Sequence, residues 1–283
     1  MIRQKISQRL HKITGTSTRL ITCLLAMALV ATLVPSSALA KTPPPVVTAG
    51  ISYGTGPSET LDAYPATNPN SPVIIAVHGG AWKSGSSADV AKICDNVQLK
   101  GWACFAINYA LAPTYVWPTQ MTNMQDALTW VQQNAANYNG DPSRLAFWGV
   151  SAGGHLSLMA AYALPGVKAV VSWSGPTDLG AMVESRNDAL GLMGCPRKGC
   201  SDPNLMPSAS PVTYAASTSP ATLLAHSQSD RTVDFFESQE LDTDLTNLGQ
   251  PDHTFLQYPG SAHALALWAQ AWTPTYNWLL AHL

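Results

Sequence analysis

Charged residues are scarce in this chain: they make up 11% of its 283 residues, while apolar residues make up 46%. A chain of this length and composition buries one large core instead of remaining disordered. Beyond the first 40 positions there are ten basic residues against seventeen acidic ones, which gives that part a net charge of −7. Because an acidic chain with no basic cluster is a poor ligand for nucleic acid, we expect no nucleic-acid partner.

The first 40 residues contain no acidic residue at all. A basic region is followed by the apolar run LITCLLAMALVATLV at 20–34 and by the small-residue site Ala38-Leu39-Ala40. This order is typical of a secretory signal peptide, so we predict cleavage after Ala40 and a secreted or periplasmic product of residues 41–283. The alternative is a membrane anchor, but the apolar run is short of the roughly 20 residues that a span needs. We therefore expect no stable membrane span after processing.

Cysteine is also rare, with five residues, of which Cys23 lies in the predicted signal peptide. The four others are Cys94, Cys104, Cys195 and Cys200. In an exported chain an even number predicts two disulfide bonds, and three pairings are open. One of them would tie a helix to the next strand and close the small loop CPRKGC. Zinc is the rival for the last two cysteines, but no second Cys or His pair stands nearby at ligand spacing, so we expect no metal.

No internal repeat is present, and short apolar runs alternate with helical patterns along the chain. Near-continuous apolar strands that are each followed by a helix predict an α/β fold with a mostly parallel sheet and helices on both faces. The expected strands lie in 71–80, 102–110, 144–150, 167–175, 220–227 and 253–260. We expect two short helices split at Pro274 to close the chain. The irregular stretch 179–219 is rich in Pro, Ser and Gly, and we predict that it is a cap inserted over the site.

Ser151 lies in the sequence GVSAG, between the strand at 144–150 and a helix that follows it. A nucleophile elbow needs this arrangement, because its strained turn leaves no room for flanking side chains. A serine also needs a base, and in this fold an acid and then a histidine follow it, each after a late strand. Asp230 and His263 satisfy both conditions. Asp178 is the rival acid, but we interpret it as a helix cap.

The sequence HGGAW at 78–82 follows the first strong strand. Backbone N–H groups of Gly79 and Gly80, together with that of Ala152, would form an oxyanion hole. Losing one such donor typically costs about 3 kcal/mol of transition-state stabilisation. We interpret the other histidines of the motifs, His78, His155 and His226, as structural, and the large aromatics Trp82, Trp117, Trp148 and Trp173 as core residues rather than pocket walls.

The series HGGAW, GVSAGG, SQSD and GSAH resembles the α/β-hydrolase fold, and within it the serine esterases that carry an HGGxW motif. The resemblance covers roughly residues 47–283. Ala81 and Val150 depart from the HGGG and GDSAGG of hormone-sensitive-lipase-like esterases, a related branch. Ala81-Trp82 instead matches the branch that includes acetyl and feruloyl esterases and arylformamidases.

The resemblance implies a serine carboxylesterase with the triad Ser151, Asp230 and His263 and no cofactor, and the predicted signal peptide implies that it is exported. The expected substrates are small-molecule or polysaccharide-linked esters with short-chain or aryl groups. Three alternatives stand beside it. An arylformamidase-type amide hydrolase would share HGGxW, a lipase would use 179–219 as a lid, and a non-catalytic binding module would keep the fold without the chemistry.

Overall fold

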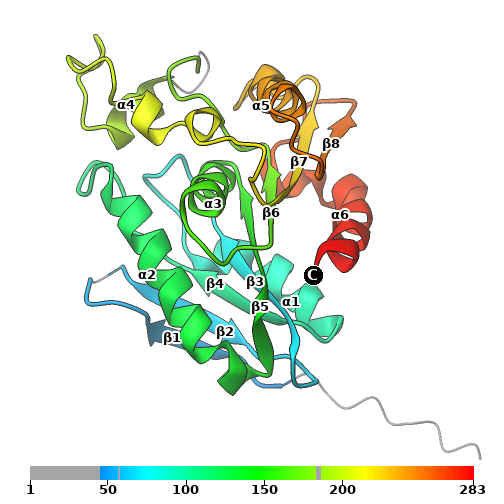
Figure 1. Ribbon diagram of the computed structural model, residues 1–283. Helices are drawn as coiled ribbons and strands as arrows, with labels where there is room; N and C mark the ends of the chain where they lie inside the picture. The colour runs from blue at the N-terminus through cyan, green and yellow to red at the C-terminus, as the bar shows by residue number, and fades with distance from the viewer. Residues whose placement is uncertain (1–44, 57, 183–185) are drawn as a thin grey trace, which may run out of the picture. The chain divides into compact units, whose positions relative to one another are not determined.

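The computed structural model describes residues 45–56, 58–182 and 186–283, and the predicted signal peptide lies outside them. Its centre is an eight-stranded sheet with the strand order β1-β2-β4-β3-β5-β6-β7-β8 (Figure 1). The strands are β1 Thr48–Ser52, β2 Thr60–Tyr64, β3 Ser71–Val77, β4 Ala103–Ile107, β5 Gly140–Val150, β6 Ala169–Trp173, β7 Ala221–Ser227 and β8 His253–Tyr258. All neighbouring pairs from β4 to β8 are parallel, and only β1 and β2 run antiparallel to their neighbours. The mostly parallel sheet is confirmed, whereas β1 and β2 were not expected.

Helices cover both faces of the sheet, as the continuous apolar strands predict. Every residue of β3, β4, β6 and β7 is buried, because each face of these strands packs against a helix. One face carries α1 (Ala91–Leu99) and α6 (Trp268–His282). The other carries α2 (Thr119–Asn134), α3 (Ala152–Ala163) and α5 (Phe235–Asn247). The fold is therefore α/β, with helical layers on either side of the sheet.

The expectation that Pro274 splits the last helix is wrong. α6 runs without a break from Trp268 to His282, with Pro274 inside it. Proline removes one backbone hydrogen bond from a helix and normally kinks or ends it. Here Trp272 and Tyr276 stack on each other on either side of the proline, and Trp272 also stacks on Trp148 of the sheet. This packing holds both halves against the sheet and offsets the lost hydrogen bond.

The four cysteines form two disulfide bonds, Cys94–Cys104 and Cys195–Cys200. The first joins α1 to β4, and the second closes the small loop after α4 (Arg186–Leu192). Of the three pairings that the sequence left open, the structure has the one that links a helix to its next strand.

The stretch 179–219 holds α4 and two short 3₁₀ turns, η3 (Pro207–Ala209) and η4 (Pro211–Thr213). Figure 1 shows α4 beyond one end of α3. Buried side chains of the stretch, such as Leu192 and Ala209, belong to the same hydrophobic cluster as residues of α3. The described part of the stretch therefore packs on the sheet's own helical layer, and its buried residues form no separate core.

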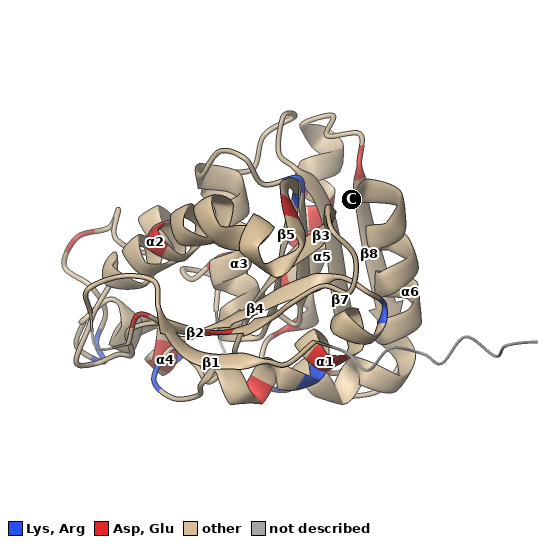
Figure 2. Cartoon of the chain, turned by 90° about the horizontal axis from the view of Figure 1, so that it is seen from below, with Lys and Arg blue, Asp and Glu red and all other residues tan. Residues whose placement is uncertain are grey.

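Lys and Arg residues are few and are scattered over several elements in the view of Figure 2, among a ribbon that is mostly uncharged. Within the described ranges, no helix has the length and apolar character needed to cross a bilayer. Nor does any group of three or more His, Cys, Asp or Glu side chains in those ranges have a geometry suited to a metal ion.

Candidate active site

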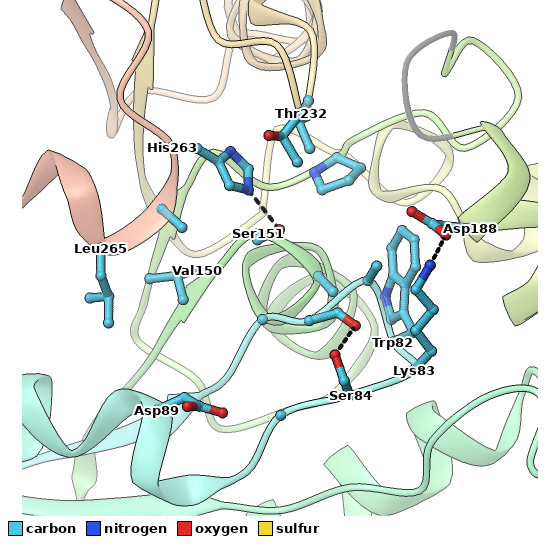
Figure 3. Close-up of a pocket in the computed structure, with 18 of the residues that line it drawn as sticks. Trp82, Lys83, Ser84, Asp89, Val150, Ser151, Asp188, Thr232, His263 and Leu265 are labelled. Atoms are coloured by element: carbon cyan, nitrogen blue, oxygen red, sulfur yellow. Dashed lines mark hydrogen bonds and ion pairs between the residues drawn. The ribbon is translucent and has the colours of Figure 1, made fainter.

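The three residues predicted as a triad lie together at the carboxyl ends of the parallel strands, where α/β proteins place their sites. Ser151 follows β5, Asp230 follows β7 and His263 follows β8. Ser151 and His263 open onto a cavity of about 590 Å³ (Figure 3). The cavity is also lined by Gly79, Gly80, Ala81, Trp82, Lys83, Ser84, Gly85, Asp89, Val150, Ala152, Pro176, Met182, Asp188, Thr232, Val233, Ala264 and Leu265.

Ser151 occupies a sharp turn between β5 and α3. Its φ of 55° lies in the left-handed region, and its N–H donates to the carbonyl of Trp173 on the adjacent strand at 2.8 Å. The turn is tight on both sides: a Cβ on Gly149 would lie 2.0 Å from the carbonyl oxygen of Gly153, and one on Gly153 would lie 2.2 Å from that of Val77. Only glycine fits at these two positions. The geometry is that of a nucleophile elbow.

Strained backbone concentrates at this site. Seven non-glycine residues within the described ranges have φ values between 53° and 61°, and two of them are asparagines, which tolerate that region. The other five all surround the cavity or support it, namely Ala81, Trp82, Ser151, Ser174 and Ala264. Such residues cost about 1–3 kcal/mol each and persist only where neighbouring contacts hold them. Ser174, for example, accepts a hydrogen bond from the N–H of Ala264 at 3.2 Å and so supports the loop of His263.

His263 joins Ser151 to Asp230 through its two ring nitrogens. Nε2 lies 2.9 Å from Oγ of Ser151, and Nδ1 lies 2.7 Å from Oδ2 of Asp230. A carboxylate only accepts, so Nδ1 carries the proton that it donates to Asp230. Nε2 is then left to accept the hydroxyl proton of Ser151. This is the orientation in which a histidine acts as general base toward a serine.

Asp230 is held as a carboxylate. Burial raises its pKa, but hydrogen bonds from His226, His263 and the N–H of Thr232 outweigh that effect and hold the pKa well below its usual range. Its Oδ1 accepts from the N–H of Thr232 at 2.8 Å and from that of Val233 at 3.4 Å. The second oxygen is thereby directed at His263.

His226 also contacts the carboxylate of Asp230, a role that was not predicted from the sequence. This fully buried side chain places Nε2 3.4 Å from Oδ2 of Asp230 and 3.1 Å from the carbonyl of Val233. Its Nδ1 lies 2.8 Å from Oγ of Ser238 in α5. The sequence signal for this contact is the spacing of four residues between His226 and Asp230 at the end of a buried strand.

The glycines of HGGAW lie beside the serine. A Cβ on Gly79 would lie 3.0 Å from Cβ of Ser151 and 3.7 Å from its Oγ, so the backbone of Gly79 packs closely against the side chain of Ser151. Ala152 is the first residue of α3, and its N–H is one of those that have no acceptor within the helix. His78 packs beneath the loop, where it stacks on Tyr109 with ring centroids 4.2 Å apart and places Nδ1 2.7 Å from the carbonyl of Gly79.

The rival acid Asp178 has other partners. Its Oδ1 accepts from the N–H of Gly180 at 2.8 Å and from Oγ of Ser210 at 3.4 Å. Within the described residues no hydrogen bond joins it to His263. It therefore caps the turn that follows β6, and the interpretation as a helix cap is wrong because the chain turns here and the next helix begins at Arg186.

Glu237 is a second residue without an assigned role in the sequence analysis. It lies in the first turn of α5 behind the N-cap Asp234, where a glutamate often folds back on its own helix. Here its buried Oε2 instead accepts from the N–H groups of Thr177 and Asp178, both at 2.8 Å. Burial outweighs these bonds and raises the pKa of Glu237 to about 7. The carboxyl thus fixes the loop that carries Pro176 of the cavity.

We expect Glu237→Gln to change how stability depends on pH. The folded pKa of about 7 lies above the ordinary value of 4.5, so the folded protein retains a proton that the unfolded chain releases. Wild-type stability is therefore lost as pH rises from 4.5 through 7, by about 3 kcal/mol at most, whereas Glu237→Gln keeps its stability in that window. Urea unfolding at pH 5 and at pH 8 measures the stability of the wild type and of Glu237→Gln. Asp95→Asn, at an exposed position of α1, is the control. Equal pH dependence in wild type and Glu237→Gln would contradict this prediction.

Comparison with known proteins agrees with the fold. The BD-FAE family model matches residues 61–245. Esterase LipQ of Mycobacterium tuberculosis is 30% identical over 244 residues, which span 78% of this chain and 58% of LipQ. A solved carbohydrate esterase from gut microbiota has a TM-score of 0.76 at 24% identity over 86% of this chain and 98% of its own. Esterase 2 of Thermogutta terrifontis, with propionate bound, has a TM-score of 0.68 at 19% identity over 85% of this chain and 95% of its own.

The fold and these similarities define an α/β hydrolase. The chain belongs to the BD-FAE family, whose model matches well over half of its length. It spans less than two thirds of the length of the curated esterases that it matches, such as LipQ and LipC of Mycobacterium tuberculosis.

Proposed function

We propose that the protein is a serine carboxylesterase. The observation that carries this proposal is the hydrogen-bonded line from Ser151 through His263 to Asp230, which opens onto the cavity at its serine end. The names of the relatives support it, since LipQ and LipC are esterases and LipM is a probable carboxylic ester hydrolase.

The proposed reaction has two steps. Oγ of Ser151 attacks the ester carbonyl carbon while Nε2 of His263 takes the hydroxyl proton. N–H groups of Gly79, Gly80 and Ala152 stabilise the oxyanion, and the protonated His263 then donates its proton to the departing alcohol. A water molecule, deprotonated by His263, then attacks the acyl carbon; the bond from that carbon to Oγ breaks, His263 returns the proton to Oγ of Ser151, and the acid is released. Asp230 holds His263 in the required tautomer throughout, and the reaction needs no metal or organic cofactor.

The proposed substrates are esters with short-chain or aryl groups. In Figure 3, Val150 and Leu265 lie to one side of Ser151, while Trp82, Lys83 and Asp188 lie to the other. The two sides thus offer separate space for the acyl and the alcohol part of an ester. A cavity of about 590 Å³ is sufficient for a small ester or for the ester-bearing unit of a polysaccharide.

Two further proposals concern the chain around the site. The first is export with cleavage after Ala40, which rests on the basic region, the apolar run and the small-residue site of the sequence. The second is that 179–219 caps the site, since Asp188 of this stretch forms an ion pair with Lys83 at the cavity wall. Recovery of protein outside the cytoplasm with Lys41 as its first residue would support the proposal, an intact Met1 on that protein would contradict the cleavage, and protein found only in the cytoplasm would contradict the export.

The test of the function compares ester and amide hydrolysis. The purified protein is assayed on p-nitrophenyl acetate, butyrate and octanoate and on N-formylanilide, and a diethyl phosphoryl group from paraoxon is located by mass spectrometry. We expect turnover of acetate or butyrate and a phosphorylated Ser151. Hydrolysis of the amide alone would point to the arylformamidase type, and a preference for octanoate that rises at an interface would point to a lipase. A protein that is inert on all four and unlabelled would contradict the proposal.

A further inference from the structure

Trp82, the last residue of HGGAW, is in an unusual conformation for so large a side chain. Its φ of 59° follows a φ of 53° at Ala81, so two successive non-glycine residues lie in the left-handed region. For a bulky residue this is a true outlier that neighbouring contacts have to hold in place. Trp82 is 1% exposed, as expected of a core residue, but it also lines the cavity, so the expectation that it is not a pocket wall is wrong. Its contacts therefore decide the shape of the loop that carries Gly79 and Gly80.

The indole of Trp82 binds one specific partner. Its Nε1–H donates to Nδ1 of His155 at 3.1 Å, and the two rings meet edge to face with centroids 5.1 Å apart. The carbonyl of Trp82 accepts from the N–H of Ala112 at 2.8 Å, which holds the backbone on the other side. Trp117 also lies near His155, with a centroid distance of 6.3 Å, but among the described residues no hydrogen bond joins the two.

The neighbours of His155 determine its protonation. Nε2 lies 2.6 Å from the carbonyl oxygen of Ala209, and a carbonyl only accepts, so Nε2 carries a proton. The indole N–H only donates, so Nδ1 carries none. His155 is thus a neutral imidazole of one tautomer. Its complete burial also lowers its pKa to about 4, which agrees with this assignment.

His155 connects the two halves of the proposed oxyanion hole. It lies in the first turn of α3, where its own N–H donates to the carbonyl of Ser151 at 3.1 Å, and Ala152 begins the same turn. Through Trp82 it also holds the loop of Gly79 and Gly80. Ala209 of the 179–219 stretch binds its other nitrogen and stops the ring from turning away.

We propose that Trp82 and His155 are positioning residues, and that the hydrogen bond between them sets the separation of the Gly79–Gly80 N–H groups from that of Ala152. This inference rests on the proposed esterase function, because the oxyanion hole is part of it. A misplacement of about 1 Å in a catalytic group can lower the rate about 100-fold. The bond should therefore affect the transition state and leave substrate binding nearly unchanged.

Three substitutions distinguish the effect of the hydrogen bond between Trp82 and His155 from the effect of general packing. Trp82→Phe keeps a ring in the same place but has no donor. His155→Asn places an amide acceptor where Nδ1 lies, whereas His155→Gln places an amide donor near Ala209 and leaves the indole without an acceptor. Trp117→Phe is the matched control, since it removes an indole N–H next to the same histidine. For each protein, kcat and KM on p-nitrophenyl butyrate, Ki of a trifluoromethyl ketone and Tm are measured.

We expect Trp82→Phe and His155→Gln to lower kcat about 10- to 100-fold with KM within about threefold, because the positioned N–H groups stabilise the oxyanion and not the ground state. The trifluoromethyl ketone adds to a serine and forms an oxyanion, so its Ki should rise by the same factor as kcat falls. His155→Asn should remain within about fivefold of wild type, and the double variant Trp82→Phe/His155→Gln should be no worse than either single one.

The inference is overturned if Trp82→Phe leaves kcat and Ki unchanged, or if Trp117→Phe has the same effect. If Trp82→Phe does not fold, equal kcat and Ki in His155→Asn and His155→Gln overturn it instead. Wild-type protein that neither turns over the ester nor binds the ketone would show that the proposed function itself fails. Active wild type with unaffected variants would show that only the positioning role fails.

Discussion

Replacement of Ser151 by alanine is expected to lower kcat/KM on p-nitrophenyl butyrate by about 10⁴- to 10⁶-fold. The reason is chemical: Oγ of Ser151 is the atom that Nε2 of His263 reaches at 2.9 Å, and alanine has no atom there. Alanine takes the φ of 55° at about the same cost as serine, so stability should change by less than about 1 kcal/mol. Initial rates and urea unfolding of the variant measure the two effects.

Ser157→Ala is the matched control for that experiment. Ser157 is buried in α3, two turns beyond the elbow, and its Oγ has no partner within the described part of the chain. Removal of that hydroxyl should leave kcat/KM within about threefold, because it touches none of the reacting groups. If Ser151→Ala kept more than a few per cent of wild-type activity, another nucleophile would have to be sought and the triad would be abandoned.

Asp230→Asn should lower kcat by about 10³- to 10⁴-fold with little effect on KM. The structure determines which way the new amide turns. The N–H of Thr232 donates to Oδ1 at 2.8 Å, so the amide oxygen takes that position and the NH₂ group faces His263. Nδ1 of His263 then has to accept, its proton moves to Nε2, and Nε2 can no longer take the proton of Ser151.

The control for this second prediction is the rival acid, with Asp178→Asn expected to keep kcat within about threefold. The two variants also separate in their response to acid. Hydrogen bonds hold the pKa of Asp230 below its usual range, so Asp230 stabilises the fold above the unfolded pKa of about 3.9 and this contribution is lost as pH falls. Asp230→Asn should remove that acid dependence of urea unfolding. A larger loss of kcat in Asp178→Asn than in Asp230→Asn would show that Asp178, and not Asp230, is the acid of the triad.

The elements that place the site were predictable because their patterns are local. Near-continuous apolar runs predicted six parallel strands, and five of the strands from β3 to β8 lie inside those runs, whereas β5 begins at Gly140, four residues before the run at 144–150. The carboxyl ends of parallel strands lie at one edge of a sheet, so the positions of Ser151, Asp230 and His263 directly after three of these strands predicted that all three lie at that edge. The strands β1 and β2 escaped prediction because each has only five residues, β1 is mostly exposed at the edge of the sheet, and buried residues in β2 are interrupted by partly exposed ones, so neither forms a continuous apolar run.

Other features depended on contacts between distant parts of the chain. Pro274 should have ended a helix by its local chemistry, but the packing of Trp272 on Trp148 overrides it. His226 was interpreted as structural, and its contact with Asp230 depends on how the chain turns after β7. Glu237 follows the pattern of a helix cap, yet its carboxylate binds the loop after β6 instead.

By itself, the sequence determined the residue types of the site, their order and the elements that carry them, because burial patterns and glycine turns act over a few residues. Only the tertiary structure decided which polar atoms meet. The bonds from Trp82 to His155, from His155 to Ala209 and from Ser151 to His263 join residues 73, 54 and 112 positions apart. No local propensity acts over such separations. Hydrogen bonds are directional, so the tautomers of His155 and His263 follow from partners that only the packed sheet brings within reach.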